Sequence, residues 1–223
     1  MKYVLEALEI SKSYLDGENK LLVLNNLELR VSPSEIIIIK GPSGSGKTTL
    51  LNILNTLDKP DFGIIKINEQ IIDYNNDKAL DKIRLSEIGI LYQDSNLLSE
   101  FSSLENLEIP FSLNREIDHH NPLDLMKRFN LESKLNNFPS ELSGGERQRI
   151  ALLRSIINKP SIVFADEPTG NLDDENVHIM IELITELRIN YKTSFVIATH
   201  DERLCDIANK TFDIKNCNLS LNR

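Results

Sequence analysis

A glycine-rich segment at residues 41–49 has the composition of a loop that cradles phosphate groups. It reads GPSGSGKTT, which fits the pattern G-x-x-x-x-G-K-[ST], and a β-branched run precedes it. Glycines let the backbone curl so that successive N–H groups point at phosphate oxygens, and the start of a helix adds positive charge. Lys47 can place a cation on the β- and γ-phosphates, and the Thr48 hydroxyl can ligate Mg²⁺.

The alternative for this segment is a glycine-rich turn that binds nothing. Average composition gives the pattern by chance in about 1% of chains of this length. The pattern therefore predicts a nucleotide site. The binding residues expected from it are Gly41, Pro42, Ser43, Gly44, Ser45, Gly46, Lys47, Thr48 and Thr49.

Two acidic residues follow a second apolar run, IVFA at 162–165. Open α/β sheets bind ligands at the carboxyl ends of their strands, where Asp166 and Glu167 would stand. Asp166 could hold Mg²⁺ through water, and Glu167 could polarise an attacking water as general base. Taken alone, a solvated acidic pair is an equal alternative. The upstream phosphate loop favours the functional interpretation.

The segment LSGGERQR at 142–149 combines a helix cap with two glycines. Ser143 and Glu146 have the S-x-x-E spacing of a capping box. A capped helix explains the serine and the glutamate, but not the paired glycines, which a helix start would avoid. Gly144 and Gly145 would leave N–H groups of the helix start free to meet an anion.

The elements that must position these residues alternate between strand and helix. We predict strands at 4–10, 24–31, 36–40, 64–68, 161–166 and 194–199, and helices at 48–57, 77–85, 144–158 and 174–190. Residues 104–136 are predicted to be mostly helical and broken up by Pro110, Pro122 and Pro139. This alternation predicts an α/β fold with a parallel sheet.

The whole chain has 223 residues, 40% of them hydrophobic, and a net charge of -9. This charge is unlike that of a general nucleic-acid binder, and it disfavours direct adsorption to an anionic membrane. No stretch is long enough to span a bilayer, and the N-terminus does not resemble a signal peptide, so we expect a soluble chain. We expect Cys205 and Cys217 to be reduced thiols, and the pair His119–His120 to lie in a solvated turn.

The motifs together resemble those of ABC ATPases over the whole chain, and LSGGE at 142–146 resembles the signature of that family. Four single residues resemble further family positions: Tyr14 in SKSY the aromatic that stacks on adenine, Gln93 in LYQD the Q-loop glutamine, Asp173 in NLD the D-loop, and His200 in ATHD the switch histidine. Taken alone, each of these four residues could have an ordinary structural role instead of a functional one. Their order around a phosphate loop makes coincidence negligible.

This resemblance implies the P-loop NTPase fold of the ABC type, with an N-terminal antiparallel β subdomain and an inserted α-helical subdomain. One domain would cover 1–223, with a core at about 1–93 and 141–223 and the helical part at about 94–140. ATP and Mg²⁺ are the implied cofactors. The implied roles are catalysis for Glu167, His200 and Gln93, metal binding for Thr48, Gln93 and Asp166, nucleotide binding for Asp173, and completion of the ATP site of a second, head-to-tail copy for Ser143, Gly144 and Gly145.

One branch of the family fits best: it holds LolD-type lipoprotein-release ATPases, MacB-type export ATPases and the division protein FtsE. The runs PSELSGGERQR at 139–149 and SLENLEIP at 103–110 favour the first type. The resemblance implies integral membrane subunits as partners, contacted through residues 94–108, a peripheral place on the cytoplasmic face of the inner membrane, and no nucleic acid. An FtsE-like regulatory clamp and a MacB-like efflux ATPase stay open. The acidic charge disfavours a soluble ABC ATPase acting on DNA or ribosomes.

Overall fold

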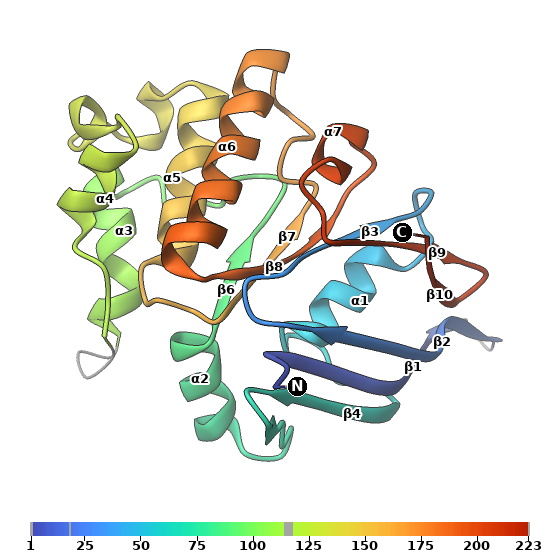
Figure 1. Cartoon of the computed structure of the whole chain (residues 1–223). Helices are drawn as coiled ribbons and strands as arrows, with labels where there is room; N and C mark the ends of the chain where they lie inside the picture. The colour runs from blue at the N-terminus through green and yellow to red at the C-terminus, as the bar shows by residue number, and fades with distance from the viewer. Residues whose placement is uncertain (1, 18, 114–117, 223) are drawn as a thin grey trace.

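The protein, seen in a computed structural model that describes residues 2–17, 19–113 and 118–222, contains two sheets and a group of helices (Figure 1). The strands are β1 (Leu5–Asp16), β2 (Asn19–Val31), β3 (Ile36–Lys40), β4 (Phe62–Ile67), β5 (Gln70–Ile71), β6 (Ile88–Leu91), β7 (Ile162–Asp166), β8 (Ser194–Ala198), β9 (Lys210–Lys215) and β10 (Asn218–Leu221). The helices are α1 (Lys47–Leu54), α2 (Asp77–Ser86), α3 (Ser103–Ser112), α4 (Pro122–Arg128), α5 (Gly144–Ile156), α6 (Asp174–Tyr191) and α7 (Glu202–Cys205). Short 3₁₀ turns occur at Glu132–Lys134 and Pro139–Glu141.

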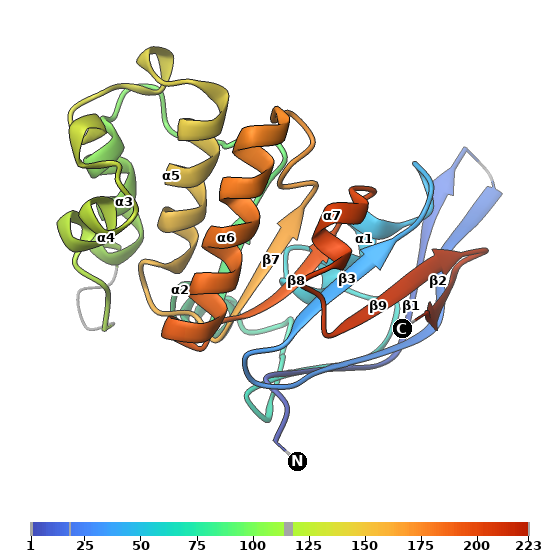
Figure 2. The ribbon, with the colours of Figure 1, turned by 45° about the horizontal axis from the view of Figure 1, so that its top comes forward.

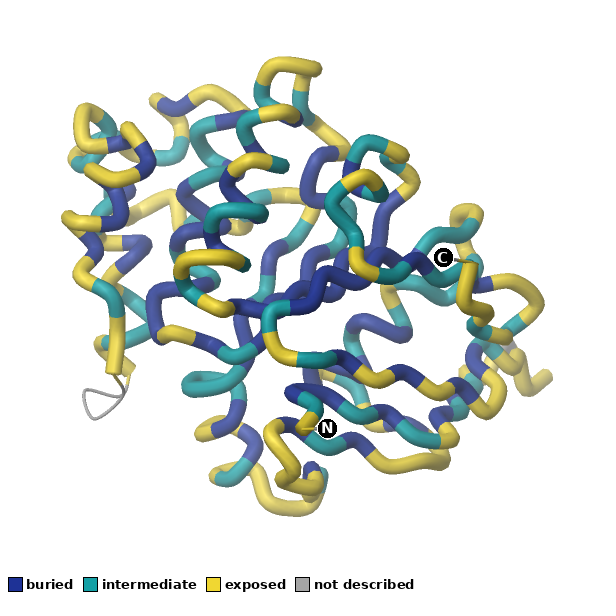
Figure 3. Tube along the Cα trace, in the orientation of Figure 1, coloured by how far each residue is buried: buried dark blue, intermediate teal, exposed yellow. Residues whose placement is uncertain are grey.

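The larger sheet has six strands in the order β10-β9-β3-β8-β7-β6. Pairing is parallel from β6 through β7, β8 and β3 to β9, and only β10 is antiparallel. Strands of such a sheet are covered on both faces, which explains the unbroken apolar runs of β3 and β8 (Figure 3). The predicted α/β fold with a parallel sheet is confirmed.

Side chains of β3 alternate between two hydrophobic cores, as the period of a strand requires. Ile37 and Ile39 pack with α1 and the smaller antiparallel sheet, β2-β1-β4-β5. Ile36 and Ile38 pack with α5 and α6 on the opposite face. Helix α1 therefore lies between the two sheets, as Figures 1 and 2 show.

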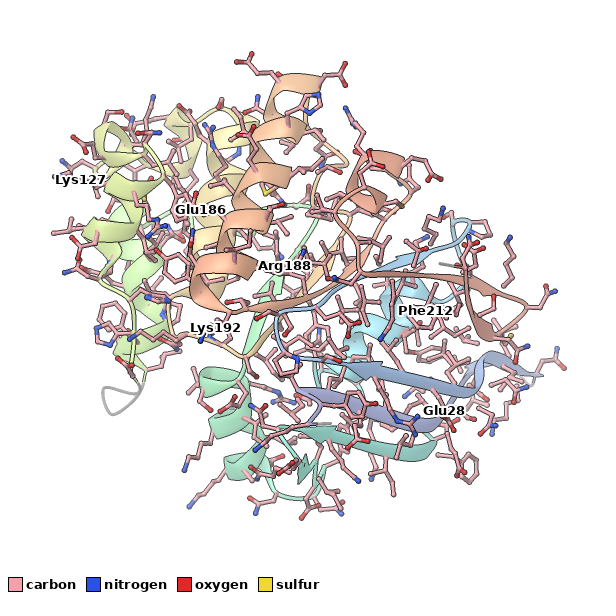
Figure 4. All side chains as sticks on the ribbon, in the orientation of Figure 1. Glu28, Lys127, Glu186, Arg188, Lys192 and Phe212 are labelled. Carbon is pink, nitrogen blue, oxygen red and sulfur yellow. The ribbon has the colours of Figure 1, made fainter. Side chains whose placement is uncertain are left out.

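Helices α3 and α4 lie beyond α5, away from the smaller sheet (Figure 2). Arg128 of α4 forms an ion pair with Glu186 of α6, with 2.7 Å between Nε and Oε1. Arg188 Nε of α6 donates to the Ser34 carbonyl at 3.0 Å, which ties α6 to the turn before β3 (Figure 4). The division into a core and a helical subdomain at 94–140 stays a prediction.

Several predicted boundaries differ from the structure. Helix α1 ends at Leu54, three residues before the predicted end, because Thr56 adopts a left-handed backbone with φ of 68°. Pro110 lies inside α3 and does not break it, whereas Pro122 starts α4. The strands β6, β9 and β10 were not predicted. In β6, a Cβ on Gly89 would collide with the Ser155 carbonyl of α5, so this glycine allows close packing rather than marking a turn.

The prediction of a solvated turn holds for His119, which is exposed in a segment without helix or strand, but only in part for His120, which is half-buried. The His119 ring stacks on Phe111 with 4.2 Å between centroids, and His120 meets Tyr191 edge-on at 4.6 Å. Burial lowers the pKa of His120 to about 4. Within the described part of the chain, no group of acidic, histidine and cysteine side chains is arranged to hold a metal ion, and both cysteines are free thiols. No described helix has the length and apolar character needed to cross a membrane.

Candidate active site

A cleft of about 640 Å³ lies where β3, β7 and β8 end and α1 begins. This is the edge at which open α/β sheets bind ligands. Its lining includes the predicted glycine-rich loop together with Tyr14, Gln93, Asp166, Glu167 and His200. Fold topology thus brings five residues from distant segments to the phosphate loop.

Three glycines shape the loop at residues 41–48. Gly44 and Gly46 have φ of 75° and 100°, in the left-handed region that glycine tolerates. A Cβ on Gly41 would lie 2.7 Å from the carbonyl oxygen of Ile214. Gly46 caps α1 without any side-chain hydrogen bond, so the first N–H groups of α1 have no side-chain acceptor. An anion is the natural partner of such a helix start.

Two polar side chains of the loop, those of Lys47 and Ser45, differ in their access to the cleft. Lys47 folds back over the loop, and its Nζ donates to the carbonyl oxygens of Gly41 at 2.8 Å and Pro42 at 3.2 Å. A phosphate group could replace these weak neutral acceptors with charged ones. Ser45 Oγ is buried and has no hydrogen-bond partner among the described residues. Lys47 lines the cleft and can meet the phosphates of a nucleotide, whereas Ser45 does not line it.

The Thr48 hydroxyl donates to Oδ2 of Asp166 at 2.8 Å, which joins α1 to the end of β7. Burial raises the pKa of Asp166, the neighbouring Glu167 charge adds to this, and the Thr48 hydrogen bond and Lys47 oppose it. A hydroxyl and a carboxylate side by side are the hard oxygen ligands that Mg²⁺ prefers. Gln93 lines the same cleft. The residues present therefore fit a magnesium ion beside the phosphates.

Glu167 stands at the end of β7 with a left-handed backbone, φ 44°. Its Oε2 accepts hydrogen bonds from Thr199 Oγ1 at 3.0 Å and from the His200 backbone N–H at 3.2 Å, and His200 Nδ1 lies 2.9 Å from the same oxygen. The carboxylate is 15% exposed, while the His200 side chain is 74% exposed. Strained backbone conformations of this kind occur at functional sites. These contacts fix the Glu167 carboxylate at the wall of the cleft.

Tyr14 lies near the end of β1 and is 42% exposed, so its ring forms part of the cleft wall. Its hydroxyl donates to Oδ2 of Asp58 at 2.7 Å. An exposed aromatic ring beside a phosphate-binding loop can stack on a nucleotide base. Sequence reasoning missed Asp58, because a contact between residues 44 positions apart leaves no local signal.

The start of α5 lies outside this cleft. Ser143 Oγ accepts from the Glu146 N–H at 3.2 Å and Glu146 accepts from the Ser143 N–H at 2.8 Å, so the predicted capping box is confirmed. Gly144 lines a separate pocket of about 280 Å³ with Gln93 and other residues. The structure does not bring Ser143, Gly144, Gly145 or Asp173 to the phosphate loop of the same chain.

The two glycines of this helix start have different surroundings. A Cβ on Gly144 would meet nothing nearer than the Asn171 carbonyl oxygen, 4.0 Å away. A Cβ on Gly145 would collide with the side-chain amide of Asn176. Asn176 also donates from Nδ2 to Oδ1 of Asp173 at 2.8 Å, and Asp173 caps α6. Sequence reasoning missed this packing role of Gly145.

Comparisons with known proteins agree with the geometry. A family model described as ABC transporter matches residues 24–170. The lipoprotein-releasing system ATP-binding protein LolD of Buchnera aphidicola subsp. Acyrthosiphon pisum is 41% identical over 216 residues, with 96% of this chain and 95% of that protein covered. The LolD protein of Cytophaga hutchinsonii is 41% identical over 213 residues, with 94% and 95% covered.

A solved structure of similar shape is the dimeric post-hydrolysis state of the ATP-binding cassette MJ0796 bound to ADP and Pi. It has a TM-score of 0.88 and 31% identity, and the match covers 98% of this chain and 99% of that one. Another dimeric structure of MJ0796, described as a bacterial ABC transporter cassette, has a TM-score of 0.87 and 32% identity, with 98% and 97% covered.

Proposed function

The chain belongs to the ABC transporter family as a LolD-type ATP-hydrolysing subunit, and we propose that it drives the release of lipoproteins by a membrane complex. One observation carries the ATPase part: Lys47, Asp166 and Glu167 meet in a single cleft on a phosphate-binding loop. The cargo is supported by relatives about 41% identical over nearly the whole chain, which are named for lipoprotein release.

The chain's own groups would divide the chemistry of ATP hydrolysis among them. The loop N–H groups and Lys47 would hold the β- and γ-phosphates, while Thr48 and Asp166, with Gln93, would hold Mg²⁺. When bound, this ion supplies charge neutralisation to the phosphate oxygens. Glu167 would take a proton from water as the water oxygen bonds to the γ-phosphorus and the bond to the β-phosphate oxygen breaks. His200 would keep that carboxylate in place.

A second copy of the chain would complete each site. Ser143 and Gly144 lie outside the cleft of their own chain, yet they begin a helix whose N-terminus can meet an anion. A head-to-tail partner could place this helix start against the γ-phosphate. ATP would then contact both copies only when they are closed, so its binding stabilises the dimer and hydrolysis loosens it. The dimeric relatives of similar structure support this arrangement.

The surface from residues 94 to 108 would transmit the closing and loosening of the dimer to a membrane subunit. Gln93 lines both the nucleotide cleft and the pocket of about 280 Å³ that contains Gly144. Next to this pocket, Leu98 and Phe101 are 44% and 39% exposed, which offers apolar anchors to a partner helix. The chain would thus sit peripherally on the cytoplasmic face of the inner membrane through its partners.

Reconstitution tests the proposal. The chain would be expressed with membrane subunits encoded in the same genome, purified as a complex by a tag on the chain, and placed in proteoliposomes holding a labelled lipoprotein. We expect ATP-dependent release of the label, and no release with Glu167→Gln. Co-purification of a small division-linked membrane protein, without any lipoprotein release, would contradict lipoprotein release as the function. It would favour a regulatory clamp of the FtsE type.

A further inference from the structure

A lysine and an aspartate lie behind the cleft-facing tyrosine and share hydrogen bonds with it and with each other. Lys12 and Tyr14 come from the same strand, β1, while Asp58 follows α1. We propose that Lys12 and Asp58 are positioning residues that hold the Tyr14 ring ready to stack on adenine. This inference rests on the proposed binding of ATP in the cleft.

Each polar group of the cluster has a partner at short range. Asp58 Oδ2 accepts from the Tyr14 hydroxyl at 2.7 Å, and Asp58 Oδ1 accepts from Lys12 Nζ at 2.7 Å. Lys12 Nζ also donates to the Lys59 carbonyl at 2.6 Å. The same ammonium lies 5.2 Å from the centroid of the Tyr14 ring. The phenol is therefore held at its hydroxyl by a carboxylate and at its ring by a cation.

Exposure of these side chains increases from the lysine toward the cleft. The Lys12 side chain is 11% exposed, that of Asp58 is 31% exposed, and Tyr14 is 42% exposed as a residue. Burying a lysine is costly unless its charge is paired, and an apolar residue would fill this place at lower cost. A buried lysine that is paired with an aspartate behind an exposed ring points to a role for the pair at the ring.

Asp58 stays ionised and Tyr14 stays protonated at neutral pH. Burial alone would raise the pKa of Asp58, but hydrogen bonds from Lys12 and Tyr14 outweigh it and hold that pKa below the usual 3.8. Burial, together with the hydrogen bond to Asp58, raises the pKa of Tyr14 above 10.0. A charged acceptor thus faces a protonated phenol, which makes a strong hydrogen bond.

Backbone irregularity on β1 helps to aim the ring. The pairing of β1 with β2 shifts register between Ile10 and Lys12 and again between Lys12 and Ser13. Such bulges re-aim side chains near binding sites. Since Lys12 covers one face of the Tyr14 ring, the base would take the other. A ring that is already fixed loses little freedom on binding, so ATP binds more tightly.

The position of Asp58 also couples the two ends of a bound nucleotide. Helix α1 begins at the phosphate loop, and just beyond its other end the Asp58 N–H donates to the Asn52 carbonyl at 2.9 Å. The group that anchors the tyrosine and the group that binds phosphates therefore belong to one short rigid segment. This segment would set the spacing between the adenine and the phosphates.

The test compares Asp58→Ala with Asp61→Ala in the full chain. Asp61 lies in the same loop and accepts from the Ser13 N–H at 2.9 Å, so it contacts β1 beside the tyrosine without taking part in the cluster. We expect Asp58→Ala to raise KM for ATP by about tenfold and to leave kcat within about twofold, since only the ordering cost of the ring changes. Asp61→Ala should change neither constant.

Inorganic tripolyphosphate separates base recognition from phosphate recognition. We expect wild type and Asp58→Ala to bind it equally, because it has no base to stack. Tyr14→Phe and Lys12→Met, which each remove one contact of the cluster, should raise KM for ATP in the same direction and give a result even if Asp58→Ala does not fold. An unchanged KM for ATP in these variants would overturn the inference. So would a loss of affinity for tripolyphosphate as large as the loss of affinity for ATP. A wild-type chain that binds tripolyphosphate no more weakly than ATP would instead count against the proposed ATP site.

Discussion

His200 Nδ1 lies 2.9 Å from Oε2 of Glu167, so residues that follow the ends of two neighbouring parallel strands, β8 and β7, meet at the nucleotide cleft. Thr199 donates to the same oxygen, and the carboxylate is held from two directions. A fixed carboxylate at this point suits proton abstraction from water, provided that substrate is placed opposite to it.

Replacing Glu167 by Gln is expected to separate binding from turnover. The amide keeps an oxygen for the hydrogen bonds from Thr199 and His200, but it cannot accept a proton. We expect kcat to fall by about 100-fold or more while the Kd for ATP changes little. Phosphate release and equilibrium binding would be measured on the same preparation, with Glu175→Gln on the exposed start of α6 as control. Wild-type turnover in Glu167→Gln would show that another group is the base.

Replacing Lys47 by Ala is expected to weaken nucleotide binding itself. Lys47 contributes a charged donor at the loop, and removing such a donor costs about 1.5–3 kcal/mol, or about 10- to 100-fold in Kd. Lys40→Ala is the matched control, since Lys40 ends β3 beside the loop but pairs with Glu202 at 3.2 Å. Equal affinities for ATP in Lys47→Ala and wild type would contradict the assignment of the phosphate loop.

Replacing Asp166 by Asn is expected to maintain or raise the thermal stability of the nucleotide-free chain, but to reduce the stabilisation that Mg-ATP gives. Burial raises the pKa of Asp166, so the folded chain binds this proton more tightly than the unfolded chain. Its contribution to stability is present below the unfolded pKa of about 3.9 and is lost as pH rises through the higher folded pKa. At pH 7 the ionised carboxylate therefore costs stability unless a cation binds it.

Thermal unfolding at pH 7 checks this expectation. The nucleotide-free Asp166→Asn chain should have a Tm equal to or above that of wild type, whereas the rise in Tm caused by Mg-ATP should largely disappear. At pH 4 the Asp166 carboxyl of wild type is protonated to a greater extent. Any excess of the Asp166→Asn Tm over the wild-type Tm should therefore be smaller than at pH 7. A lower Tm for Asp166→Asn without ligand at pH 7 would show that the carboxylate stabilises the empty fold.

Replacing Gly145 by Ala is expected to disturb the start of α5 because Asn176 occupies the place of the new methyl group. Overpacking of this kind costs about 1–3 kcal/mol of the free energy of unfolding. Gly144→Ala, which enters open space, should cost less. The double variant Gly145→Ala/Asn176→Ala, which removes the clashing amide without placing a glycine in α6, should recover most of the loss in urea unfolding. A double variant no more stable than Gly145→Ala would refute the contact as the cause.

The parallel core could be predicted from sequence because its strands are buried on both faces. The run IIIIK at 36–40 is strand β3 with the predicted bounds, and β7 and β8 match their predictions within one residue at either end. Buried parallel strands show continuous apolar runs that need no tertiary information. By contrast, Gly89 gives β6 the look of a turn, although it serves close packing against α5.

The candidate site was predictable where a motif is local and not where contacts join distant segments. The phosphate loop was found because its spacing alone carries the chemistry, and the acidic pair was assigned because it follows an apolar run in a chain that has this loop. The contact between Tyr14 and Asp58 and the packing of Asn176 on Gly145 depend on how separate elements meet. The end of α1 depends on the left-handed backbone of Thr56, which no propensity for threonine indicates.

The mass and nucleotide content of the Glu167→Gln chain with saturating Mg-ATP test the central claim most directly. Light scattering on an eluting size-exclusion peak, with base absorbance recorded in parallel, gives both quantities. We predict a species of twice the 25.4 kDa chain mass with one ATP per chain, and its loss when Ser143 is changed to Arg. A species of single-chain mass that carries no nucleotide under these conditions would contradict the account.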